Sequence, residues 1–580
     1  MLEQALKYFN ITYEKKGDAL ILDNYIPSDG TYVIVKPSDE GFEIIDKVDI
    51  KQDKKTKEID RSNKYLDFIC IADYYSGLID MNKPIDGKKI IHSNNYLSFF
   101  VKKDSFSSKK LKDEIIENYY NVLRNPRLKY SKPKAKALYN LVEEEIGAVD
   151  EEKLNKIEEW IKENIFELGN SVTGKDYLKI FFYYDEKEFE QEGKRYLIPN
   201  IYNNNDFNEI VDGDVYGLPN NNMGLNAKKP YLENKTRKVK VPYLINQNQV
   251  LSQKKFFDYL MNQVCIGKYT IYMNQEEIVP LGSNELPAKE FQGIYFRIKK
   301  GKEVEIHDFD VISKYNPKLI KEFEYVNVLD ADYAVLKQSY ESIHTLEDMN
   351  QLINDVMFSK MLISNYFTDA KDISIKDQKI KQNILFARDT LIDWFYKDRW
   401  VNAWKVLDRV SLELLKHAIE CGYGIRAINQ CNLRLSLKNY FEGGEKMADV
   451  IRDLKENLKE KIKDKDTSYI ESDREYLFAV GQMAAYLLSK SKTKKQMLSM
   501  INPFLNIKKD EIIKERLKGL FKKYNYDLGN YKEPRNLYAM IAGYQMEGQI
   551  KEDMIIVGYL HSNILYEKKE ENKGGENDGK

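Results

Sequence analysis

A change in hydrophobic pattern near Leu346 is the feature that most restricts how this chain can fold. Before it, short β-branched runs bounded by turn residues alternate with helical stretches. After it, apolar residues recur at steps of three and four, and no strand pattern of useful length appears. We therefore expect an α+β protein, with a mixed α/β N-terminal region at residues 1–345 followed by a C-terminal α-helical bundle at 346–565.

The mixed region contains two predicted β-hairpins and a predicted helix. Thr31–Pro37 and Gly41–Ile50 are β-branched runs separated by a short turn, and Gly293–Ile312 has the same pattern with Lys300-Gly301 as its turn. Glu151–Phe166 has helical spacing. An Asn-, Gly- and Pro-rich loop, Asp212–Pro230, is the longest break in periodicity.

One helix predicted in the C-terminal region has an apolar stripe along one face. One apolar stripe consists of Leu407, Val410, Leu414, His417 and Cys421, so we expect His417 to be a hydrogen-bonded core residue and not a ligand.

A later helix should begin with a capping box formed by Ser472 and Glu475. Small residues follow it, and they should permit close packing against another helix: Ala479, Gly481, Ala484 and Ala485.

Composition excludes several classes of protein. The 91 basic residues nearly cancel the 92 acidic ones, so net charge gives no argument for nucleic-acid binding. Four separated cysteines form no C-x-x-C pair, which argues against a zinc site and favours reduced thiols. No window is apolar enough to span a membrane, and the first residues do not resemble a secretory signal. We expect a cytoplasmic protein with no membrane partner and no cofactor, ending in a disordered tail at residues 566–580.

Motifs for catalysis are absent from the sequence. There is no P-loop, no G-x-S-x-G and no dinucleotide fingerprint after a strand. His307, Asp308 and Asp310 resemble part of a metal site, but a single H-D-x-D favours the end of a strand. We therefore expect a binding or assembly protein and not an enzyme. A metal-dependent nuclease using these three residues is the main alternative, and a scaffold that never touches nucleic acid is another.

Two segments concentrate positive charge with little matching acid. The first is Asn226–Leu244, in which six cations accompany the single acid Glu233: Lys228, Lys229, Lys235, Arg237, Lys238 and Lys240. The second follows a helix end and contains Lys490, Lys492, Lys494 and Lys495, where cations also complement the helix dipole. Dense cations of this kind neutralise phosphates.

Five long segments, in order along the chain, resemble one known family. They are Ile91–Lys103, Gly224–Ile245, Leu433–Asp449, Phe478–Lys492 and Ile501–Leu505. These segments look like the large subunit of type I-B CRISPR interference complexes, the Csh-type Cascade proteins, and the resemblance extends to about Tyr566. Other Cascade large subunits can carry a zinc-binding cysteine cluster, which this chain lacks.

The resemblance implies a non-catalytic role in antiviral defence. A large subunit of this family is expected to bind near the crRNA 5′ handle, beside the handle-capping and backbone subunits. It is expected to read the protospacer-adjacent motif in double-stranded DNA, to aid strand opening and to help recruit a separate helicase–nuclease. Pairing with the guide RNA reads the rest of the target.

The resemblance also supplies candidate contacts to DNA or crRNA. The first group comprises the six cations of Asn226–Leu244 together with Asn226. Asn220, Asn221 and Asn222 are candidate readers of base edges. Asn94, Asn95 and Lys102 form a third group.

Gly443-Gly444 should end one helix before a new one begins near Glu445–Asp449. At the message level, Gly-Gly can be encoded as GGA-GGU, the core of a ribosome-binding site, at a suitable distance before the codon of Met447. The family is expected to make a free small subunit from the 3′ part of the same gene. We hypothesise internal translation from Met447, which would yield Met447–Lys580 as a separate small subunit whose helices lie in the bundle segment 446–565. Met349, Met357 and Met361 are alternative starts.

Overall fold

The computed structural model describes most of the chain: residues 2–39, 41–219, 244–301, 303–329, 343–444, 447–463, 468–491, 498–524, 528 and 531–566. The fold divides into two compact units. We call Met1–Glu285 with Gln292–Ser313 the mixed unit, and Leu286–Phe291 with Lys314–Lys580 the helical unit. The pattern change at residues 345/346 coincides with the junction between strand β13 (Ile343–Thr345) and helix α11 (Leu346–Val356), inside the helical unit.

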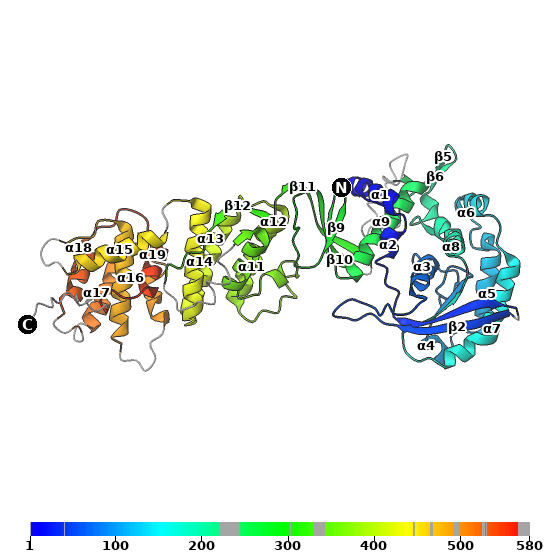
Figure 1. The fold of residues 1–580 in the computed structure, drawn as a ribbon, viewed down its shortest axis with the longest axis horizontal. Helices are drawn as coiled ribbons and strands as arrows, with labels where there is room; N and C mark the ends of the chain where they lie inside the picture. The colour runs from blue at the N-terminus through cyan, green and yellow to red at the C-terminus, as the bar shows by residue number, and fades with distance from the viewer. Residues whose placement is uncertain are drawn as a thin grey trace, which may run out of the picture. The chain divides into compact units, whose positions relative to one another are not determined.

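The first sheet of the mixed unit has the strand order β2-β1-β4-β3, and its edge strand β2 is labelled in Figure 1. Its strands are β1 (Gly30–Ser38), β2 (Gly41–Ile50), β3 (Ser98–Lys102) and β4 (Tyr177–Phe182). β1 pairs with β2 in an antiparallel hairpin, as predicted, and with β4 in parallel. Helices α3 (Leu66–Ser76), α5 (Asp113–Arg124), α7 (Glu151–Asn170) and α8 (Glu186–Asn200) contribute side chains to the core of this sheet. The predicted helix at Glu151–Phe166 is confirmed by α7.

The second sheet has the order β11-β10-β8-β9. β10 (Phe291–Lys300) and β11 (Val304–Tyr315) form the second predicted hairpin, while β8 (Thr270–Met273) and β9 (Ile278–Leu281) continue the sheet. Apolar side chains of α1 (Leu2–Lys16), α2 (Ala19–Leu22) and α9 (Gln247–Cys265) pack on it. The chain therefore returns to its own N-terminal helices after more than two hundred residues, and this return creates the site described below.

The remaining elements of the mixed unit are short or peripheral. A three-stranded sheet has the order β5-β6-β7. The bounds are β5 (Glu209–Val211), β6 (Asp214–Gly217), β7 (Ile245–Asn246), α4 (Asp104–Ser107), α6 (Pro133–Ile146), η1 (Pro126–Leu128) and η2 (Asn205–Phe207).

The helical unit contains one small sheet, β12 (Lys318–Phe323) with β13, followed by helices. These are α11, α12 (Gln378–Lys397), α13 (Ala403–Glu420), α14 (Gly424–Glu442), α15 (Met447–Lys461), α16 (Asp473–Ser489), α17 (Asp510–Tyr524), α18 (Glu533–Gly543) and α19 (Glu552–Leu560), with η4 (Ile363–Asn365) and η5 (Leu498–Phe504). In the described residues from Leu346 onward there is no strand, which agrees with the predicted α+β class and its C-terminal helical region. None of the described helices combines the length and apolarity needed to cross a membrane.

The predicted helix break at Gly443-Gly444 is confirmed. α14 ends at Glu442, and the two glycines have φ angles of 70° and 103°, a region that side chains with a Cβ rarely adopt. The Gly443 N–H donates to the Asn439 carbonyl, closing the last turn. α15 then begins at Met447.

Of the other two local predictions for this region, the one for His417 is confirmed and the one for Ser472 and Glu475 is confirmed in part. His417 is mostly buried and its Nε2 lies 2.8 Å from an Asp377 oxygen, which makes it a hydrogen-bonded core histidine as expected. Ser472 caps α16 by accepting a hydrogen bond from the Glu475 N–H. The reciprocal half of the capping box is absent, because the Glu475 carboxylate instead accepts from the Glu471 N–H and binds Lys461.

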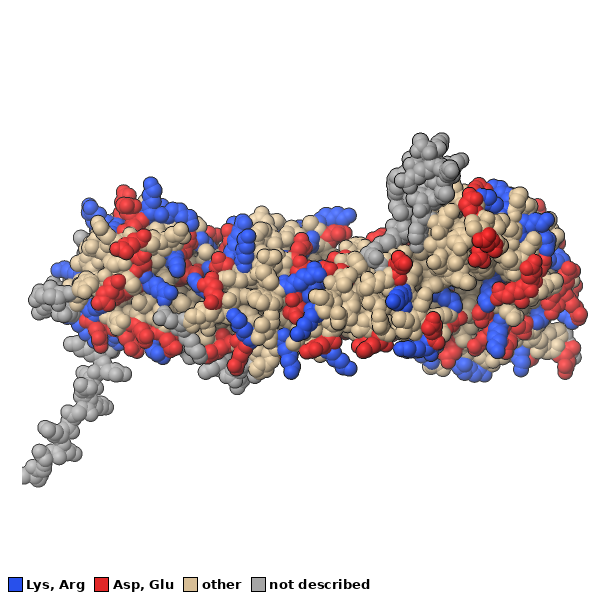
Figure 2. Space-filling model, turned by 90° about the horizontal axis from the view of Figure 1, so that it is seen from above, with Lys and Arg blue, Asp and Glu red and all other residues tan. Residues whose placement is uncertain are grey.

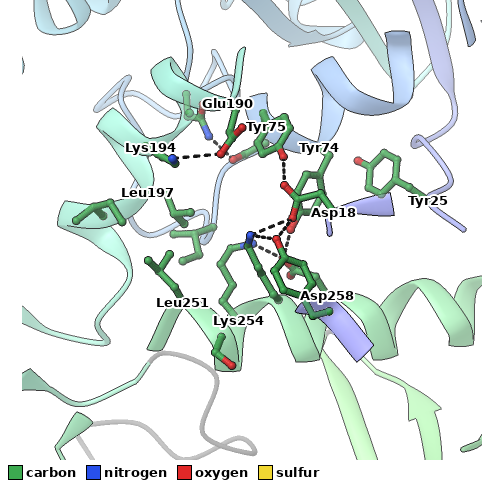
Figure 3. Close-up of a pocket in the computed structure, with 18 of the residues that line it drawn as sticks. Asp18, Tyr25, Tyr74, Tyr75, Glu190, Lys194, Leu197, Leu251, Lys254 and Asp258 are labelled. Atoms are coloured by element: carbon green, nitrogen blue, oxygen red, sulfur yellow. Dashed lines mark hydrogen bonds and ion pairs between the residues drawn. The ribbon is translucent and has the colours of Figure 1, made fainter. Parts of the chain in front are cut away.

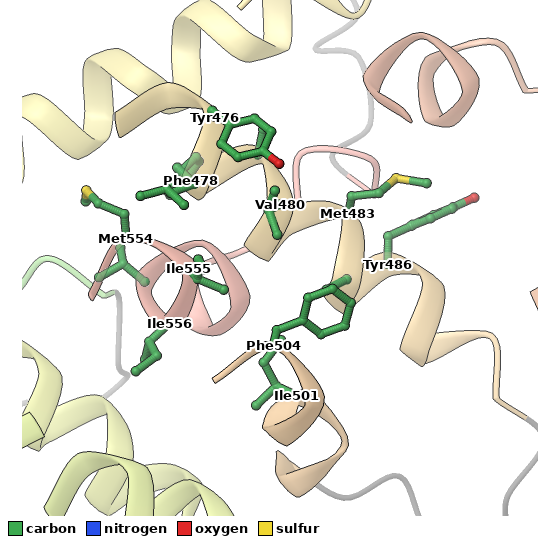
Figure 4. Packing of buried hydrophobic residues seen from close by; sticks show 14 of the residues in the cluster. Tyr476, Phe478, Val480, Met483, Tyr486, Ile501, Phe504, Met554, Ile555 and Ile556 are labelled. Atoms are coloured by element: carbon green, nitrogen blue, oxygen red, sulfur yellow. The ribbon is translucent and has the colours of Figure 1, made fainter. Parts of the chain in front are cut away.

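α16 is the central helix of the core formed by α15 to α19. Nearly all of its side chains are buried. Phe478, Val480 and Met483 belong to one core cluster with Ile555 and Ile556 of α19 and Phe504 of η5, and Figure 4 shows part of this cluster. Burial on nearly every face explains why this helix has little polar surface, unlike α15 or α17.

Candidate functional site

One cavity of the mixed unit has a volume of about 630 Å³. Its wall comes from α1, α3, α8, α9 and the segments around them, which meet where α9 packs on the N-terminal helices (Figure 3). Pockets for small ligands commonly have volumes of about 300–1,000 Å³ and are apolar with a few placed polar groups. This cavity fits that description, since Phe9, Leu197, Leu251 and Met261 lie among its charged and tyrosine side chains.

Asp18 is the most heavily hydrogen-bonded carboxylate of the cavity. It accepts hydrogen bonds from the hydroxyl groups of Tyr13 and Tyr75, and Lys255 Nζ lies 3.0 Å away. Burial would raise the pKa of Asp18, but the two tyrosine hydrogen bonds and the Lys255 charge outweigh burial and lower it. Asp18 is therefore an anion that ties α1, α3 and α9 together, and Figure 3 shows Tyr75 directed toward it.

The same carboxylate affects its tyrosine partners. Burial and the hydrogen bond to Asp18 raise the pKa of both Tyr13 and Tyr75, and the negative charge of Glu190 adds to the effect. Both phenols therefore remain protonated near neutral pH. They act as donors and as aromatic surface, and not as proton-transfer groups.

Two further carboxylates of the cavity, Asp258 and Asp73, each accept a tyrosine hydrogen bond and pair with a lysine. Tyr74 donates to Asp258 at 2.8 Å, and Lys254 forms an ion pair with the same carboxylate. Tyr25 donates to Asp73 at 2.9 Å, while Lys179, on β4, neutralises Asp73. Each of these acids therefore has a lysine partner.

The acids near α8, Glu190 and Glu145, do not each have a lysine partner of their own. Lys194 lies 3.1 Å from Glu190 and 3.6 Å from Glu145, so one ammonium group serves two carboxylates. Figure 3 shows Lys194 directed toward Glu190. Because Lys254, Lys255 and Lys179 are each engaged elsewhere, the cavity retains an excess negative charge at this side.

The carboxylates do not assemble into a metal centre. In the part of the chain that the structure describes, no three His, Cys, Asp or Glu side chains are grouped to hold a metal ion. The cavity offers ring faces, fixed hydroxyl groups and anionic oxygens, and this combination suits binding of a ligand that carries hydrogen-bond donors.

Most of the residues predicted to bind nucleic acid belong to segments that the structure does not describe. The following lie outside the described residues: Asn220, Asn221, Asn222, Asn226, Lys228, Lys229, Lys235, Arg237, Lys238, Lys240, Lys492, Lys494 and Lys495. The predictions made for them stay predictions.

Asn94 and Asn95 require a correction. They are 4% and 1% exposed, and their amide groups donate to the carbonyls of Gly77 and Phe189. Both side chains therefore brace the fold and offer no surface to a nucleic acid. Lys102, at the end of β3, is exposed. Lys490 ends α16 with its ammonium group over the rings of Tyr486 and Tyr566.

The His307, Asp308 and Asp310 string lies within β11. His307 Nε2 is 3.1 Å from the Glu305 carboxylate, and Asp308 and Asp310 accept hydrogen bonds from the next backbone N–H. Ile306 and Phe309 of β11 both pack against the core of the second sheet, so side chains do not alternate strictly between the two faces along this string. The nuclease alternative stays a prediction.

Charge is mixed on the face of the described residues that Figure 2 shows. In the view of Figure 2, Lys and Arg side chains alternate with Asp and Glu, with no continuous basic band across that face. This distribution matches the nearly neutral total charge.

The cavity itself was not anticipated from the sequence. One signal was present, the run Asp73-Tyr74-Tyr75 on α3, in which acid and aromatic residues adjoin. Its partners come from segments up to about 180 positions away, as in the Tyr74–Asp258 hydrogen bond. Only the tertiary structure brings them together.

Comparison with known proteins gave no relative. A scan against protein families, a search of curated proteins and a search of solved structures each found no match to this chain.

Proposed function

We propose that this protein is the non-catalytic large subunit of a type I-B CRISPR RNA-guided surveillance complex. The observation that carries the proposal is the resemblance of five segments, in order, between Ile91 and Leu505. In this role the chain binds the crRNA handle end of the complex, recognises the protospacer-adjacent motif in duplex DNA and helps recruit a separate helicase–nuclease. Its partners are the crRNA, the target DNA, the handle-capping and backbone subunits and a small subunit.

The fold is compatible with this role. Three of the resembling segments contribute to one core of the helical unit, through Leu435 of α14, Phe478 of α16 and Phe504 of η5. These buried residues serve packing, so the nucleic-acid contacts are proposed for the basic segment Asn226–Leu244.

Replacing Lys235, Arg237 and Lys238 together with alanine should weaken target binding by the reconstituted complex at physiological salt. If all three contact phosphates, the slope of log K against log [salt] should become shallower by about 2 to 3. The matched control replaces Lys508, Lys518 and Lys522, which are exposed in and beside α17 among acidic residues. Unchanged affinity and slope in the first variant would remove this segment from the proposal.

We also propose that Met447 initiates a separate small subunit. The start of α15 at Met447 is a place where a new chain loses no part of a helix. Synonymous recoding of Gly443-Gly444 should abolish most of a small species that co-purifies with the complex, without changing the full-length protein. Intact mass should match Met447–Lys580. A small species of undiminished amount, or a mass corresponding to Met349, Met357 or Met361, would exclude this start.

A further inference from the structure

The cavity between α1, α3, α8 and α9 has features that point to one class of ligand. Its acidic side chains outnumber its lysines, five to three: Asp18, Asp73, Asp258, Glu145 and Glu190 against Lys194, Lys254 and Lys255. Lys179 neutralises Asp73 from outside this wall, and the remaining imbalance lies where Glu145 and Glu190 share Lys194. A bound cation would complete this charge balance, whereas a phosphate would add to the repulsion.

The tyrosine rings of the wall already face ammonium groups. Lys255 Nζ lies 4.4 Å from the centre of the Tyr13 ring, and Lys254 Nζ lies 5.3 Å from that of Tyr74. Both distances are within the range in which a cation is attracted to an aromatic face. The cavity is thus lined by surfaces that stabilise positive charge at close range.

A buried acceptor provides an observation independent of the charges. Asn94 belongs to the cavity wall and is 4% exposed. Its Nδ2 donates to the Gly77 carbonyl, but its Oδ1 accepts no hydrogen bond among the described residues. An unpaired buried acceptor costs free energy, so the wall of this cavity includes one acceptor that no described donor satisfies.

We propose that this cavity binds a cationic nitrogen group, an ammonium or guanidinium, carried on a slender aliphatic arm. The excess charge of Glu145 and Glu190 attracts the cation, and the faces of the wall tyrosines pack against the arm. A volume of about 630 Å³ admits either a small free amine or one basic side chain of a partner protein. The proposal does not depend on the function proposed above.

Calorimetric titration of the purified full-length chain tests the proposal. Agmatine and spermidine represent free amines, N-acetyl-argininamide represents a basic side chain, and inorganic phosphate is the control of opposite charge. At least one cation should bind with a Kd below about 1 mM, and phosphate should not bind in the cavity. Tighter binding of the free amines would identify a small molecule, and tighter binding of the argininamide would identify a partner side chain.

Two variants on α8 separate specific binding from general attraction. Glu190→Gln removes half of the unbalanced pair at a side chain that is 36% exposed, so folding should be retained. It should weaken binding of the cation about tenfold, equivalent to about 1.4 kcal/mol. Glu186→Gln, at the exposed first residue of the same helix, should leave binding unchanged. Equal affinity in both variants, or no saturable binding of any cation, would overturn the proposal.

Discussion

Replacing Asp553 with alanine should lower the free energy of unfolding of the helical unit by about 3 kcal/mol. The Arg434 guanidinium is 4% exposed and binds Asp553 through two nitrogens, at 2.7 and 3.1 Å. Removing one member of a buried ion pair typically costs about 3–5 kcal/mol, because the remaining charge stays buried without its partner. Asp408 and Ser411 also accept from Arg434, which places the expected loss at the lower end of that range.

Urea unfolding followed by tryptophan fluorescence measures this loss. Three of the four tryptophans, Trp394, Trp400 and Trp404, belong to the helical unit, so fluorescence mainly reports this unit. The control is Asp389→Ala, whose side chain is 88% exposed beside Arg388 and whose loss should change stability by less than about 0.5 kcal/mol. Indistinguishable effects of the two variants would show that the buried pair is not stabilising.

A double variant tests the physical reason. Arg434→Met with Asp553→Leu removes both charges and leaves apolar side chains, so it should recover most of the stability lost in Asp553→Ala. The pair also concerns the separate small subunit proposed above. A chain that begins at Met447 lacks Arg434, so its Asp553 must remain in contact with water or bind a partner's cation.

Gly481→Ala should destabilise the helical unit by a comparable amount, about 3 kcal/mol. A Cβ at this position would lie 2.3 Å from the Ile555 carbonyl oxygen and 2.7 Å from the Tyr559 nitrogen, both backbone atoms of α19. Side-chain adjustment cannot relieve these contacts, so the two helices must separate and lose packing. Overpacking of a core typically costs about 1–3 kcal/mol, and a clash with backbone belongs at the upper end.

Gly519→Ala is a matched control of opposite sign. Gly519 lies inside α17, and an added Cβ there would meet nothing within 4 Å. Alanine should therefore stabilise the unit by about 0.5–1 kcal/mol through helix propensity alone. The same urea titration measures both variants. A Gly481→Ala protein as stable as the wild type would mean that α16 and α19 do not approach as closely as described.

Local sequence determined the secondary structure wherever apolar residues followed a single repeat, of about two residues for a strand or 3.6 for a helix, along a whole segment. The two hairpins, the helix at Glu151 and the break at Gly443-Gly444 could be predicted because alternation, spacing and glycine conformation act within a few residues. The small residues of α16 were also read correctly as a close-packing surface. Gly481 packs against the backbone of α19, which lies more than 70 residues later in the chain and cannot be identified from the residues around Gly481.

Tertiary structure alone decided the roles of the polar residues. Asn94 and Asn95 read as surface polar residues, and burial beneath α8 converts them into braces for the backbone. The cavity joins Asp18 to Lys255, and the helical core joins Arg434 to Asp553. The sequence does not show whether a charged side chain faces water or a counter-charge from a distant segment. The free energy of that side chain in the folded protein depends on its desolvation and its pairing. Those depend on which segments fold together.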